Sequence, residues 1–127
     1  GSTVVNSENV DTYDIVTIQL YESYSHADYN VTAAPTADRQ TAAQYLQAWV
    51  PIVLAGWMVD FASDPDSGLP AQSVSVKKTA LCIGLANGWA DNVKNILIMP
   101  DEVGEAYSAL EAIGAEPRGF AFWAIDN

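Results

Sequence analysis

Three short apolar runs, spaced along the chain, constrain the fold of this 127-residue sequence more than any other feature. They read Asp-Ile-Val-Thr-Ile-Gln-Leu-Tyr at 14–21, Thr-Ala-Leu-Cys-Ile-Gly-Leu at 79–85 and Arg-Gly-Phe-Ala-Phe-Trp-Ala-Ile at 118–125. Each run is too short for a typical helix, and β-branched and aromatic residues favour strands. The three runs therefore predict three strands, with little polar alternation to suggest a solvated face.

A helical pattern over 41–61 follows the first run. Its apolar residues recur at spacings of three and four, which places them on one face: Ala42, Tyr45, Leu46 and Trp49. Pro51 should kink this helix or restart it as a second segment over 52–61, because proline removes a helical donor and clashes with the preceding turn. Turn-forming residues over 64–70 should end it.

A second helix is expected over 101–113, where Asp101 and Glu102 suit the positive end of the helix and Gly114 serves as its stop. Strands that alternate with helices at this spacing pair in parallel through crossover connections, as in α/β sheets and barrels. We expect one α/β domain over 1–127. The chain has no Gly-x-Gly-x-x-Gly or phosphate-loop pattern, which excludes the commonest nucleotide-binding explanations.

The charge of the chain limits its partners. Sixteen Asp and Glu against five Lys and Arg give a net charge of -11, which repels nucleic acid and anionic membranes. The longest apolar run, 49–59, falls short of the roughly 20 residues of a membrane span. We therefore expect no nucleic-acid partner and no membrane partner. A glycosylation sequon at Asn30, Val31 and Thr32 favours a secreted protein.

The chain contains a single cysteine, Cys82, and a single histidine, His26. One cysteine excludes an internal disulfide and a multi-cysteine metal site. Because Leu81 and Ile83 flank it, Cys82 is expected to be a buried core thiol. His26 lies in a polar stretch and is expected to be an exposed loop residue. No metal and no cofactor is expected.

The ends of the three runs carry a family resemblance: Gln19-Leu20-Tyr21-Glu22, Ile83-Gly84-Leu85-Ala86 and Gly119-Phe120-Ala121-Phe122-Trp123. In this order they resemble the last three barrel strands of a family 18 glycoside hydrolase, which is chitinase-like. The resemblance covers the chain from about Tyr13 to Asn127. It implies a partial (β/α)8 TIM barrel, the C-terminal portion of the complete fold.

The resemblance also implies roles for four residues. Tyr21 would contact the N-acetyl group of the substrate, Trp123 would form the floor under the sugar, and Gln19 would support Tyr21 or the acetamido group. Glu22 stands where the family has Asn or Asp, and its carboxylate either serves the same pocket or faces solvent. The implied ligand is chitin or an N-acetylglucosamine oligosaccharide. Active sites of barrels collect at the carboxyl ends of the strands, which agrees with these positions.

The motif that carries the family's catalytic acid, Asp-x-x-Asp-x-Asp-x-Glu, is absent. Asp11 and Asp14 have the first spacing, but Val16 and Ile18 occupy the next two required positions. No catalytic residue is therefore expected in this chain. Three strands also cannot close a barrel and would leave two sheet edges, so we expect self-association or pairing with a missing N-terminal part.

These observations predict the C-terminal fragment of a chitinase-like hydrolase, which contributes the sugar-binding floor and is inactive alone. Two alternatives stay open. One is a chitinase-like lectin that binds sugar without the acid. The other is a small α/β interaction domain in which all four tryptophans belong to the core.

Overall fold

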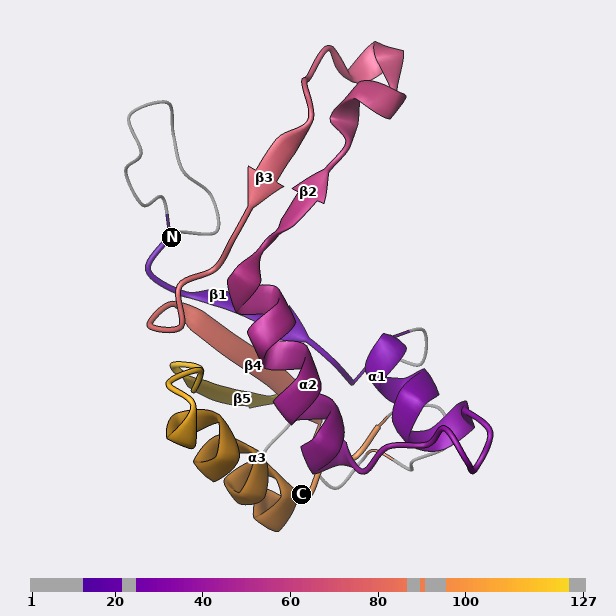
Figure 1. Ribbon diagram of the computed structural model, residues 1–127, viewed down its shortest axis with the longest axis vertical. Helices are drawn as coiled ribbons and strands as arrows, with labels where there is room; N and C mark the ends of the chain where they lie inside the picture. Colours follow the sequence, from indigo (N-terminus) through magenta and orange to yellow (C-terminus); the bar gives the residue numbers. More distant parts are fainter. Residues whose placement is uncertain (1–12, 22–24, 87–89, 91–95, 124–127) are drawn as a thin grey trace.

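A three-stranded parallel sheet forms the centre of the computed structural model (Figure 1). Its strands lie in the order β1 (Val16–Gln19), β4 (Leu81–Ala86) and β5 (Gly119–Trp123). All three predicted strands are present, and the α/β class with parallel pairing is confirmed. The structure describes residues 13–21, 25–86, 90 and 96–123.

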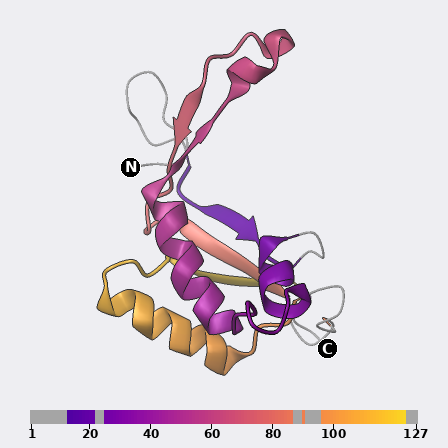
Figure 2. The ribbon, with the colours of Figure 1, turned by 45° about the vertical axis from the view of Figure 1, so that its right-hand side comes forward.

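The two long helices, α2 (Ala42–Ala55) and α3 (Pro100–Ala112), cover the same face of the sheet and pack against each other (Figures 1 and 2). Between β1 and α2 lie the short helix α1 (His26–Asp28) and a π-helical turn over Tyr29–Ala33. Within the described residues, β1 and β5 are edge strands, so the sheet is open rather than a closed barrel.

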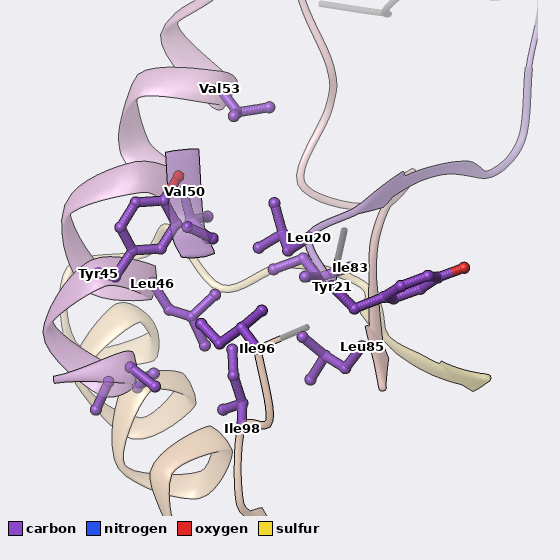
Figure 3. Packing of buried hydrophobic residues seen from close by; sticks show 14 of the residues in the cluster. Leu20, Tyr21, Tyr45, Leu46, Val50, Val53, Ile83, Leu85, Ile96 and Ile98 are labelled. Carbon is purple, nitrogen blue, oxygen red and sulfur yellow. The ribbon is translucent and has the colours of Figure 1, made fainter. Parts of the chain in front are cut away.

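The core fills the space between the sheet and the helices. Leu81, Ile83 and Leu85 of β4 point toward the helices and are almost completely buried. Figure 3 shows Ile83 and Leu85 on the side of the sheet that faces α2, whose buried side chains include those of Tyr45, Leu46, Val50 and Val53. Burial raises the pKa of the Tyr45 hydroxyl above its usual value. The apolar face predicted for this helix is thus the face of α2 that packs against the sheet in the core.

Helix α2 begins as its sequence predicts and ends earlier. Thr41 and Gln44 form a capping box: Thr41 Oγ1 accepts from Gln44 N at 3.1 Å, and Gln44 Oε1 accepts from Thr41 N at 2.9 Å. The helix runs through Pro51 without a break, because the burial of its apolar face offsets the loss of one backbone hydrogen bond. The prediction of a second helical segment over 52–61 is wrong, because α2 continues unbroken to Ala55 and is not helical beyond it.

The residues after α2 form a hairpin instead. Gly56 ends the helix with φ 85° and ψ 172°, a conformation that is essentially restricted to glycine. The chain then enters β2 (Trp57–Val59), which pairs antiparallel with β3 (Gln72–Val74). Two short 3₁₀ turns, Phe61–Ser63 and Pro65–Ser67, connect these strands. The turn chemistry predicted for 64–70 is confirmed, but the hairpin around it was not predicted.

Helix α3 has both predicted ends within one residue. Pro100 occupies its first turn, and Met99 N donates to Glu102 Oε2 at 2.9 Å. Gly114, with φ 71°, follows the helix, and Ala115 N donates to Leu110 O at 2.9 Å. This termination turns the chain back toward β5.

An ion pair joins the segment before β4 to the segment before β5. Lys78 Nζ donates to Glu116 Oε1 at 2.8 Å, and this hydrogen bond lowers the pKa of Glu116 from its ordinary 4.5. Because the pKa of Glu116 is lower in the folded state than in the unfolded state, its charged form stabilises the fold at pH values above the unfolded pKa. This stabilisation is lost as the pH falls through the pKa of the folded state.

We therefore expect Glu116→Gln to lower the urea midpoint of unfolding at neutral pH. In acid, the midpoints of the variant and the wild type should become equal. Glu105→Gln, which removes an exposed carboxylate from α3, is the matched control and should lower the urea midpoint much less at neutral pH. Parallel curves for wild type and Glu116→Gln at all pH values would contradict the role of this pair.

Candidate functional site

The face of the sheet opposite the helices carries the residues singled out from the sequence. Side chains alternate along a strand, so Leu20 enters the core while Tyr21 points to the other side (Figure 3). The register then aligns neighbouring strands: Gln19 lies beside Gly84, and Gly84 lies beside Ala121. Two residues further along each strand, on the same face, Ala86 lies beside Trp123. Residues from three strands thus meet on one face.

A small pocket of about 90 Å³ lies on this face, at the carboxyl ends of the strands. Three of the four predicted sugar-binding residues line it, namely Gln19, Tyr21 and Trp123, whereas Glu22 lies outside the described residues. Tyr21 is buried, but Trp123 remains 63% exposed. The remaining lining residues are Thr17, Gly84, Ala121 and Phe122.

The small residues of β4 and β5 create this hollow. A Cβ atom on Gly84 would lie 3.3 Å from Gln19 Cα and 3.4 Å from Thr17 Cγ2, so the glycine leaves room for the side chains of β1. Ala121, its neighbour on β5, is also small. Sequence reasoning did not assign Thr17, Gly84 or Ala121 to the site, because their convergence depends on the strand register.

The size of the pocket limits what it can hold. Ligand pockets commonly measure about 300–1,000 Å³, so this hollow accommodates a substituent such as a methyl or an acetamido group rather than a whole sugar ring. The exposed indole of Trp123 beside it offers a flat apolar surface on which a ring could stack. Together the two features fit a ring that carries one small substituent better than a fully enclosed ligand.

The chemistry of the lining is neutral. None of the seven described lining residues is acidic or basic. The polar groups of the lining residues are the side-chain amide of Gln19, the hydroxyl groups of Thr17 and Tyr21, and the indole N–H of Trp123. Such groups can orient a ligand, but a carboxylic acid that acts as general acid would have to come from elsewhere. Among the described residues, no group of three His, Cys, Asp or Glu side chains could hold a metal ion.

A larger hollow of about 540 Å³ lies near the amino ends of α2 and α3. Two of its charged residues already serve the fold: Arg39 donates to Ala34 O through Nε at 3.2 Å and Nη2 at 2.9 Å, and Glu102 caps α3. The sheet face, which carries the residues predicted from the sequence, is the better candidate site.

Cys82 and His26 also have defined positions. Cys82 lies on the open face of the sheet and is half-buried, so the expectation of a core thiol is wrong. The alternation of β4 sends Leu81 and Ile83 into the core and Cys82 to the other side. His26 is exposed, as predicted, but it is the first residue of α1 rather than a loop residue.

No helix in the described parts of the chain is long and apolar enough to cross a membrane. The chain matches no protein-family model, no curated protein and no solved structure. The resemblance to family 18 glycoside hydrolases therefore depends on the strand-end motifs alone, and the site must be judged by its own geometry.

Proposed function

We propose that this chain is the C-terminal part of a chitinase-like barrel and that its open sheet face binds an N-acetylglucosamine unit of a chitin chain. The observation that supports this proposal is the convergence of Gln19, Tyr21 and Trp123 on one pocket, although they come from opposite edges of the sheet. In this proposal the acetamido group enters the hollow over Gly84, and the sugar ring stacks on Trp123.

The open face also supports a larger assembly. Parallel sheets are normally covered on both faces, whereas here both long helices lie on one side. The strands β1 and β5 are edges in the described structure, and unpaired edges favour pairing with further strands. Additional barrel strands, from a longer chain or a second copy, would cover this face and extend both edges.

The lining of the pocket has no carboxylic acid, so sugar binding and catalysis would belong to different parts of the barrel. This chain would position the sugar, and the catalytic acid of the Asp-x-x-Asp-x-Asp-x-Glu motif would come from the N-terminal strands. Because a chitin-degrading enzyme meets its polymer outside the cell, the proposal includes secretion, in agreement with the sequon at Asn30.

Titration with N-acetylglucosamine oligosaccharides tests the site. We expect Trp123→Ala to weaken binding about tenfold, because loss of a stacked aromatic surface costs roughly 1 kcal/mol or more. Trp57→Ala is the matched control, since Trp57 is also exposed but lies on the hairpin, outside the pocket. Calorimetry measures both affinities. Equal affinities for Trp123→Ala and the wild type would refute the sugar floor.

The same titration separates the alternatives. If the wild-type chain binds no oligosaccharide even when joined to its N-terminal strands, a small α/β interaction domain is the better description. If sugar binds and the upstream coding sequence lacks the acidic motif, the protein is a chitinase-like lectin. The neutral lining of the described pocket keeps the lectin as the second candidate.

A further inference from the structure

The hairpin between α2 and β4 projects from the body of the molecule (Figures 1 and 2). We call it the arm and define it as residues 57–74, that is, β2, the two 3₁₀ turns and β3. Since β4 begins soon after the arm, the arm lies near the amino ends of the strands. The candidate sugar site lies at the opposite, carboxyl ends, so the arm belongs to a different surface.

The tip of the arm has a defined structure built from local hydrogen bonds. Ser67 Oγ donates to Phe61 O at 2.9 Å, and Asp64 Oδ1 accepts from Asp66 N at 3.1 Å. Ser63 Oγ donates to Asp60 O at 2.8 Å. These side-chain bonds fix the connection between β2 and β3, so the arm presents a shaped surface rather than an irregular loop.

This surface exposes large apolar side chains. The exposed fractions are 43% for Trp57, 64% for Met58, 36% for Phe61 and 53% for Leu69. A two-stranded hairpin is only marginally stable by itself in water, and grouped exposed apolar residues commonly mark an interaction surface. The arm therefore gains most from a partner that covers these side chains.

The charge of the arm selects the kind of partner. Its three carboxylates, Asp60, Asp64 and Asp66, are exposed, and no Lys, Arg or His occurs between Gln40 and Lys77. A second copy docked arm to arm would bring two sets of these aspartates together with no basic residue in either arm to meet them, so repulsion opposes that contact. Carboxylates interspersed with the apolar residues also oppose insertion into a lipid surface. A positively charged protein segment satisfies both the apolar and the acidic side chains.

We propose that the arm binds a basic, extended segment of a partner protein, which adds as a third strand to the two-stranded sheet. Within the described residues β2 and β3 pair only with each other, so each presents an outer edge to such a segment. Apolar side chains of the segment would cover Trp57 or Met58, which lie on opposite faces of β2, and its Lys or Arg side chains would meet the aspartates. This inference is independent of the sugar site.

A peptide of alternating Lys and Val residues is the probe, and one of alternating Glu and Val is its matched opposite. We expect the Lys peptide to bind, with nuclear magnetic resonance shifts concentrated in 57–74, and the Glu peptide not to bind. The variant Asp60→Asn/Asp64→Asn/Asp66→Asn should bind about tenfold more weakly, because complementary charges at close range contribute about this much in sum. Asparagine at position 64 keeps the Oδ1 acceptor of the tip.

The control variant Asp38→Asn/Glu105→Gln/Glu111→Gln removes the same number of exposed charges outside the arm. It should keep the affinity for the Lys peptide within about twofold if the arm is the site. An equal loss in both variants would mean attraction to the overall negative charge and would overturn the proposal. The proposal would also be overturned if the Lys peptide did not bind or if its resonance shifts lay outside the arm. It would equally be overturned if the wild-type arm bound neutral phosphatidylcholine vesicles, or a second copy of the chain, and Trp57→Ser abolished that binding.

Discussion

Replacement of Ile83 by alanine is expected to lower the free energy of unfolding by about 3–4 kcal/mol. Ile83 lies on the central strand β4, is 0% exposed, and packs in the core between the sheet and α2. The substitution loses the transfer free energy of the removed methyl and methylene groups and leaves a cavity that the two-layer core can fill only partly. A domain of ordinary stability has about 5–15 kcal/mol in total, so this loss is a large share of it.

Urea unfolding of Ile83→Ala and Ile52→Ala measures this prediction against a matched change. Ile52 lies on α2 but is 66% exposed, and alanine is the better helix former, so its replacement should change stability by less than about 0.5 kcal/mol. Similar midpoints for the two variants would show that the face between the sheet and the helices is not the core of the molecule.

The core could be predicted because its pattern is local. The apolar run around Ile83 and the helical spacing of Tyr45 and Leu46 each identify an element from a few neighbouring residues. The arm could not be predicted in the same way. Its strands have three residues each, and apolar residues such as Trp57 and Met58 fit a continued helix as well as a strand. Only pairing with β3 decides between them.

The residues of the candidate site also fall into those that a local pattern predicts and those that it does not. Tyr21, Gln19 and Trp123 were predicted because strand-end motifs resemble those of a known family, and the structure brings them to one pocket. Thr17 and Gly84 join them through the register of β1 on β4, which no local pattern specifies. The position of Cys82 on the open face follows from the alternation of side chains along β4. The apolar residues on either side of Cys82 predicted its burial, but neighbours in a strand point to the opposite face.

Gly56→Ala is expected to have the second large effect, at the base of the arm. A Cβ atom at this position would lie 2.6 Å from Val74 O and 3.1 Å from Ser75 Cβ, so the two ends of the hairpin would have to move apart. The backbone at φ 85° and ψ 172° adds strain of about 1–3 kcal/mol for any residue with a side chain. Because the clash involves backbone, no side-chain rotation can relieve it.

Gly68→Ala separates these two causes, since Gly68 also has a positive φ of 64° but a Cβ atom there would meet nothing within 4 Å. This control should cost only about 1 kcal/mol. Hydrogen exchange of the amides of β2 and β3 should increase strongly in Gly56→Ala and only slightly in Gly68→Ala, while the amides of β4 report on the body of the fold. Fast exchange confined to the arm in Gly56→Ala would show that Gly56 stabilises the base of the arm and not the body of the fold. Equal exchange in the two variants would mean that the close approach of Gly56 to Val74 does not hold the hairpin in place.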